Sequence, residues 1–141
     1  MQLHLQLSPD GHAMLGQDEA GNEMQLSLPE SAGGGAVGFR PMQLMMMSLG
    51  GCAAVDVLTI LKKQRQQVED LLIDIAADRF HRPLPAPWEK AHLVFTVYGK
   101  VDQQKAEKAV EMSVQKYCSA AETLRLAGAT ITWEVKVVKK V

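Results

Sequence analysis

One stretch of this 141-residue chain, residues 41–67, reads PMQLMMMSLGGCAAVDVLTILKKQRQQ, and its part from Met42 to Leu61 is the longest apolar run of the chain. Pro41 suits the first turn of a helix, because the N–H that proline lacks would be unpaired there anyway. Basic residues near the end of the stretch complement the negative end of the helix dipole. The pattern predicts a helix from Pro41 to about Gln67. Because the helix is apolar nearly all round as far as Leu61, we expect it to be buried at the centre of the fold.

A membrane span is the alternative interpretation of this stretch. An aspartate near its middle, Asp56, costs about 2.5–3.5 kcal/mol on membrane-insertion scales, so a buried helix of a soluble protein is favoured and no membrane partner is expected. The N-terminus alternates polar and apolar residues and lacks the basic start and apolar run of a secretory signal. Two cysteines do not make a secreted disulfide framework. We therefore expect a cytoplasmic protein with reduced thiols.

Six strands are predicted from the alternation of apolar and polar residues. Three precede the helix, at Leu3–Leu7, Ala13–Leu15 and Met24–Leu28, and three follow it, at Ile73–Asp78, Leu93–Gly99 and Thr130–Val137. A small, glycine-rich segment, 31–38, separates the first three strands from the helix and is predicted to be a loop.

Two further helices are predicted between the fifth and sixth strands. Asp102 is placed to cap the first. One face of this helix is predicted to carry residues at helical spacing, namely Ala106, Ala109, Val110, Ser113, Val114 and Tyr117. Ser119 is expected to cap the second, which Gly128 ends.

The predicted order βββ–α–ββ–αα–β contains no repeated strand–helix–strand unit, which indicates an α+β fold with antiparallel sheets around the central helix. The length indicates one domain, residues 1–141. The net charge of −1 and the absence of a strong basic block argue against nucleic acid as a partner.

Two cysteines are the most reactive side chains of the sequence. Cys52 follows Gly50 and Gly51 on the predicted helix, and these glycines would let backbone or a small ligand approach the thiol. Cys118 lies just before the predicted Ser119 cap, where backbone N–H groups would favour a thiolate and lower its pKa. For each cysteine the alternative is a buried structural residue, because cysteine packs as a small hydrophobe.

Three other residues are candidates for a site around Cys52. Arg40 precedes the helix and could polarise an oxygen or stabilise a thiolate, or could be a solvated loop residue. Asp56 lies one turn after Cys52, where its charge would raise the pKa of the thiol, unless it serves only as a hydrogen-bond acceptor. Met42 begins a methionine-rich run that either packs in the core or lines an apolar pocket. The histidines show no metal-ligand spacing, so no metal is predicted.

Two segments together resemble one known family. The first contains Arg40-Pro41-Met42-Gln43-Leu44 and Ser48-Leu49-Gly50-Gly51-Cys52-Ala53-Ala54-Val55-Asp56-Val57; the second contains Lys116-Tyr117-Cys118-Ser119 followed by Thr123-Leu124. They are similar to the OsmC/Ohr family of osmotically inducible and organic hydroperoxide resistance proteins, and most similar to its OsmC-like branch. The order of predicted strands and helices fits the family over nearly the whole chain.

The resemblance implies an intertwined homodimer that shares its active sites between chains. It implies that Cys52 is the peroxidatic thiol, which attacks an organic hydroperoxide, and that Cys118 resolves the product as a disulfide. The family's reductants are dithiols, often lipoyl groups. No metal or bound organic cofactor is implied.

Two departures from the family's pattern support a second hypothesis. Well-studied members have glutamate directly after the proline, where this chain has Met42, and an arginine in the N-terminal strands, whereas no arginine precedes Arg40 here. In those members the two groups form an ion pair that activates the thiolate. The second hypothesis is therefore a non-catalytic or differently reactive relative that binds an apolar or thiol-bearing small molecule in the same pocket.

Overall fold

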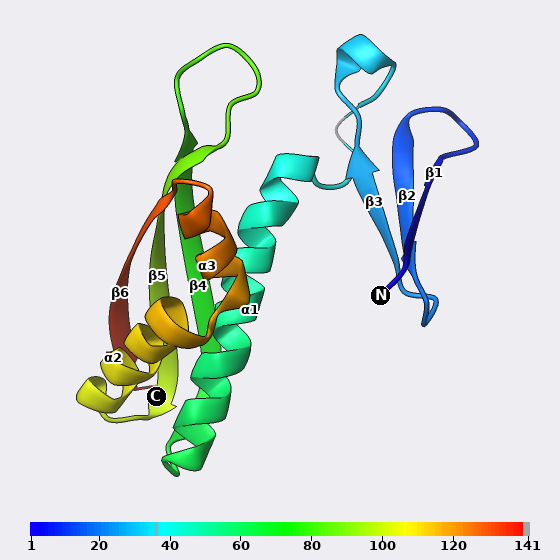
Figure 1. Ribbon diagram of the computed structural model, residues 1–141. Coiled ribbons are helices and arrows are strands. Elements are labelled where there is room, and N and C mark those ends of the chain that lie inside the picture. Colours follow the sequence, from blue (N-terminus) through cyan, green and yellow to red (C-terminus); the bar gives the residue numbers. More distant parts are fainter. Residues whose placement is uncertain (36, 140–141) are drawn as a thin grey trace. The chain divides into compact units, whose positions relative to one another are not determined.

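The computed structural model of the protein describes residues 1–35 and 37–139, so Ala36 of the predicted loop lies outside the described residues. The chain divides into two compact units, Met1–Met45 and Met46–Val141. Its elements, drawn in Figure 1, are β1 (Leu3–Leu7), β2 (Ala13–Asp18), β3 (Glu23–Ser27), η1 (Glu30–Ala32), α1 (Pro41–Lys63), β4 (Gln67–Arg79), β5 (Trp88–Lys100), α2 (Gln103–Met112), η2 (Ser113–Tyr117), α3 (Ser119–Leu126) and β6 (Thr130–Val138). This order matches the predicted one, and the predicted α+β class is confirmed.

The first unit carries a three-stranded antiparallel sheet in the order β1–β2–β3. Because side chains alternate between the two faces of a strand, the register that pairs Leu5 with Gly16 and Gly16 with Met24 separates an apolar face from a polar one. The leucines of β1 lie on the apolar face, and Leu3 is 71% exposed. The sheet therefore presents an uncovered apolar surface in the single chain.

Helix α1 starts at Pro41, as predicted, but ends at Lys63 instead of Gln67. Arg65 takes a positive φ of 57°, which turns the chain. Gln67 is already paired with Lys100 as the first residue of β4. Gln67, which was predicted to end the helix, therefore belongs to the sheet, because pairing with β5 satisfies its backbone hydrogen-bonding groups.

One face of α1 is buried and the other is not. The buried side chains recur at helical spacing and are Met46, Leu49, Ala53, Val57 and Leu61. Apolar residues on the remaining surface are exposed, among them Met45, Met47, Val55 and Leu58. The expectation that α1 is buried all round is therefore wrong for the single chain. By length and composition α1 could also cross a membrane, but its buried face belongs to the protein core.

The second unit contains the sheet β4–β5–β6. β4 and β5 are antiparallel, but β5 and β6 run parallel, so the prediction of purely antiparallel sheets is wrong for this pair. Parallel neighbours need a long crossover, and α2, η2 and α3 supply it. The inward side chains of β5, such as Phe95, form one core with the three helices, which lie against this sheet in Figure 1.

Candidate functional site

A π-helical turn sets the position of Cys118. α2 ends at Met112, and the next five residues form η2, in which the Cys118 N–H donates to the Ser113 carbonyl oxygen at 2.7 Å. An ordinary α-helical turn would bring Tyr117 back over Ser113, whereas the wider π turn brings Cys118 there. Tyr117 is consequently 48% exposed. The prediction that Tyr117 shares the buried helix face is wrong for this reason.

The thiol of Cys118 is buried against α1. Its side chain is 2% exposed, and its Sγ donates to the Leu49 carbonyl oxygen at 3.9 Å. The same sulfur accepts the Ala121 N–H at 3.4 Å, so Cys118 is the N-cap of α3. The predicted cap at Ser119 is therefore wrong by one residue. The sulfur replaces the usual cap oxygen at this helix start.

The structure brings the two cysteines together. Leu49, whose carbonyl oxygen Cys118 contacts, lies one turn before Cys52 on α1. Cys52 is half-buried and packs against the core cluster that includes Cys118. Its thiol is close enough to raise the pKa of Cys118 both as a hydrogen-bond partner and as a charge. Both cysteines are free thiols, so the described state is the reduced one.

Burial, together with a smaller effect of the neighbouring Cys52, raises the pKa of Cys118 from its ordinary value of 9.0 to about 11. The N–H groups of Ala121 and Ala120 lower it, as the sequence analysis anticipated. Desolvation is the larger effect, because a thiolate loses more hydration energy than these two donors return. The expected lowering of this pKa is therefore wrong, and Cys118 is protonated at neutral pH.

The raised pKa predicts how attack by Cys118 on a bond at Cys52 depends on pH. Thiolate is the attacking species, and its fraction rises about tenfold per pH unit below the pKa. We expect the rate of Cys52–Cys118 disulfide closure to keep rising between pH 9 and pH 10.5. Closure is measured as the second, concentration-independent release of coloured thiolate after mixing with an aromatic disulfide reagent. A plateau near pH 8.5 would show that Cys118 ionises as an ordinary thiol.

A hydroxyl group links the two segments that carry the cysteines. Ser113 is fully buried, and its Oγ lies 3.1 Å from the Ala53 carbonyl oxygen and 3.1 Å from Asp56 Oδ2. Asp56 thus serves as a hydrogen-bond acceptor, one of the two roles that the sequence left open. Arg125 supports the same turn, since its Nη1 donates to the Val114 carbonyl oxygen at 2.7 Å. Sequence analysis gave Ser113 no functional role and did not single out Arg125, because nothing in the spacing indicates a π turn.

The two glycines before Cys52 have different surroundings. A Cβ added to Gly50 would lie 2.8 Å from Ile75 Cδ1, so α1 approaches β4 closely there. A Cβ added to Gly51 would meet nothing within 4 Å. The space around Gly51, the residue directly before Cys52, is therefore open. A small residue at this position fits a path by which a ligand could approach the Cys52 thiol.

Substitution of the two glycines should separate packing from access. Gly51→Ala should leave the chain folded, with a free energy of unfolding raised by roughly 0.5–1 kcal/mol, because alanine favours the helix. Its Cys52 should nevertheless react more slowly with bulky disulfide reagents. Gly50→Ala should lower the free energy of unfolding and leave the reactivity of Cys52 less affected. Denaturant titration and thiol kinetics measure both; equal reactivity in Gly51→Ala and the natural protein would remove Gly51 from the approach path.

The remaining candidates lie in the first unit. Arg40 is exposed, and its backbone N–H is capped by Gln43 Oε1 at 2.9 Å. Met42 is half-buried, and of the methionines that follow it only Met46 joins the core, while Met45 is exposed. Arg40 and Met42 thus belong to a different unit from Cys52, and their roles stay predictions.

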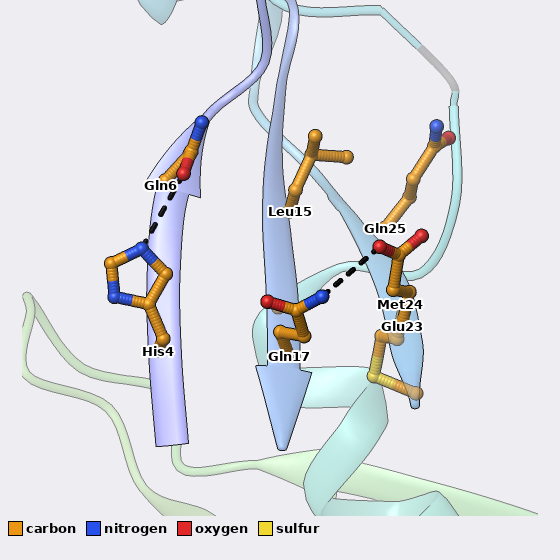
Figure 2. Close-up of a pocket in the computed structure, with 8 residues that line it drawn as sticks. His4, Gln6, Leu15, Gln17, Glu23, Met24 and Gln25 are labelled. Carbon is orange, nitrogen blue, oxygen red and sulfur yellow. Dashed lines mark hydrogen bonds between the residues drawn. The ribbon is translucent and has the colours of Figure 1, made fainter. Parts of the chain in front are cut away.

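Two pockets add surfaces that the sequence did not predict. One, of about 480 Å³, begins one turn beyond Cys52 and is lined by Asp56, Thr59, Ile60, Lys63, Gln64, Met112 and Tyr117. The other, of about 360 Å³, lies on the polar face of the β1–β2–β3 sheet, where Gln17 Nε2 donates to Glu23 Oε1 at 3.2 Å (Figure 2). Over residues 1–35 and 37–139, no three His, Cys, Asp or Glu side chains gather as metal ligands would.

Known proteins resemble this chain in sequence and in fold. The sequence profile of the family described as OsmC-like protein matches residues 33–134. Protein YhfA of Escherichia coli (strain K12) is 33% identical over 119 residues, which are 84% of this chain and 85% of YhfA. A solved hypothetical protein from Aquifex aeolicus VF5 is 32% identical, with a TM-score of 0.79 over 97% of this chain and 96% of its own.

The organic hydroperoxide resistance protein OhrB of Bacillus subtilis has the same fold. It is 16% identical, with a TM-score of 0.62 over 97% of this chain and 96% of its own, a likeness that shows the fold alone. Fold and site together define an α+β protein in which the half-buried thiol of Cys52 lies next to the buried thiol of Cys118. The chain belongs to the OsmC-like protein family.

Proposed function

We propose that the protein reduces organic hydroperoxides by a two-cysteine mechanism. The observation that carries this proposal is the pairing of a half-buried Cys52 with a buried, protonated Cys118. A hydroperoxide reaching the site from solvent would meet Cys52 first. The membership in the OsmC-like family supports the proposal, and so does the fold shared with a protein named for organic hydroperoxide resistance.

In this mechanism the Cys52 thiolate attacks one oxygen of the O–O bond. That bond breaks, Cys52 becomes a sulfenic acid, and the alkoxide takes up a proton and leaves as an alcohol. Cys118 then attacks the Cys52 sulfur, so that the S–O bond breaks, an S–S bond forms, and the departing hydroxide leaves as water with the Cys118 proton. An external dithiol, such as a lipoyl group, returns the disulfide to two thiols by exchange.

We further propose that the protein forms a homodimer in the cytoplasm, and that residues 1–141 form one OsmC-like domain. Support for the dimer comes from the apolar surfaces that one chain leaves uncovered, on β1 around Leu3 and on α1 around Val55 and Met47. Exposed apolar patches are typical of protein–protein interfaces. Arg40, Met42 and Gly51 are proposed to line the substrate path in that dimer.

One equivalent of an organic hydroperoxide tests the two-cysteine mechanism directly. We expect both thiols to be lost for each hydroperoxide consumed, and peptide mass spectrometry to find Cys52 joined to Cys118 within one chain. Diamide, which oxidises vicinal thiols without an O–O bond, serves as the positive control for closure. If diamide closes the pair but the hydroperoxide leaves both thiols free, the protein is not a peroxidase.

Met42 favours the second candidate, a relative that binds an apolar or thiol-bearing small molecule without rapid turnover. A methionine cannot hold an arginine by a charge-assisted hydrogen bond, as a glutamate does. Met42→Glu separates the candidates. If Arg40 lies near enough to pair with the new carboxylate, as the arginine of the well-studied members does, the variant should consume hydroperoxide faster. If the site serves only for binding, the new charge should leave turnover negligible and weaken the binding of apolar ligands.

A further inference from the structure

The cysteine-bearing segments are joined by a short chain of hydrogen bonds through Ser113. The Ser113 carbonyl oxygen accepts the N–H of Cys118 at 2.7 Å. Its hydroxyl contacts two atoms of α1, the Ala53 carbonyl oxygen and Asp56 Oδ2, each at 3.1 Å. Ala53 is the residue directly after Cys52. One fully buried serine therefore connects the backbone of one cysteine to the helix turn that carries the other.

We infer that Ser113 is a positioning residue that holds Cys118 within reach of Cys52, so that the rate of disulfide closure is set by its hydroxyl contacts with α1. This inference rests on the proposed function for the biological use of the disulfide, but closure itself can be measured without a hydroperoxide.

The geometry explains why this one hydroxyl matters. Closure requires the two Cα atoms to come within roughly 7 Å, and errors of about 1 Å in the position of reacting groups can slow a reaction on the order of a hundredfold. The π turn, which places Cys118 over Ser113, has a wider ring than an α turn. The Ser113 side chain ties the start of that turn to Ala53 and Asp56, which follow Cys52 on α1. Arg125 fixes the turn from its other side, through Val114.

The test uses Ser113→Ala in the full chain and an aromatic disulfide reagent. The first release of coloured thiolate reports attack by Cys52 and depends on reagent concentration, whereas the second reports closure by Cys118 and does not. We expect the first phase to match that of the natural protein and the second to slow by about ten- to a hundredfold. Equilibration with glutathione should show the effective concentration of the pair reduced about tenfold, which for a two-electron couple is about 30 mV.

Matched variants of Asp56 keep the inference testable if Ser113→Ala fails to fold. Asp56→Asn retains an oxygen that can accept the Ser113 hydroxyl, and Asp56→Ala does not. Slower closure in Asp56→Ala than in Asp56→Asn supports the inference, and equal closure in the two overturns it. For a folded Ser113→Ala, closure at the natural rate overturns it, as does an equal slowing of both phases. Failure of the proposed peroxidase would appear separately, as closure with the reagent but none with hydroperoxide.

Discussion

Cys52→Ser should lower the rate of organic hydroperoxide consumption by roughly a thousandfold or more. The sulfur of cysteine undergoes a two-electron oxidation to a sulfenic acid, which the hydroxyl oxygen of serine cannot undergo. The fold should be unchanged, since Cys52 is half-buried and contacts the core without belonging to its fully buried set. The rate is measured as loss of hydroperoxide in the presence of a dithiol.

Cys118→Ser is the matched control for this loss. It retains Cys52, so it should consume about one equivalent of hydroperoxide and yield a sulfenic acid that dimedone traps. It should then turn over slowly, because no second thiol within the chain can close the disulfide. Activity in Cys52→Ser that equals activity in Cys118→Ser would show that the two cysteines do not have the distinct roles assigned to them.

Val55→Asp should dissociate the proposed homodimer. Val55 is 65% exposed in the single chain and lies on the apolar surface of α1 that the core does not cover. Burying an unpaired carboxylate in an interface costs on the order of 3 kcal/mol or more, which raises the dissociation constant by at least about a hundredfold. Sedimentation of the natural protein at micromolar concentration should give two chains, and the variant should give one.

Val55→Thr controls for the substitution itself. It keeps the shape of the side chain and adds only a hydroxyl, so it should remain largely dimeric. Circular dichroism should show all three proteins folded, because Val55 makes no part of the buried core. A natural protein that sediments as a stable monomer would contradict the proposed homodimer, whatever the variants do.

The periodicity of apolar residues in the sequence predicted the order of helices and strands, and it predicted the central residues of most of them. Asp102 caps α2 as expected, with its Oδ1 accepting the Lys105 N–H at 3.0 Å. Strand direction was not predictable, because side chains alternate in the same way in parallel and antiparallel pairs. The parallel pairing of β6 with β5 was therefore missed. Strand length was underestimated as well, since the solvent-facing side of β4 is rich in acidic residues such as Asp70.

For the candidate site, the sequence singled out the two cysteines and Asp56, but it did not predict the direction in which the pKa of Cys118 shifts. A thiol at a helix start suggests a lowered pKa, and only the structure shows that Cys118 is desolvated strongly enough to reverse the direction. Ser113 was assigned to a buried face without a role. A π turn differs from an α turn by one residue, and the segment 113–117 satisfies the helical pattern in either form.

The account's central claim is tested most directly by steady-state consumption of peroxide with dihydrolipoamide as the reductant. The natural protein should consume an organic hydroperoxide such as cumene hydroperoxide faster than hydrogen peroxide, with one dithiol oxidised for each peroxide lost. Its rate should depend on Cys52. Consumption that does not exceed the background reaction of dihydrolipoamide, for either peroxide, would contradict the account and leave the protein as a binding member of its family.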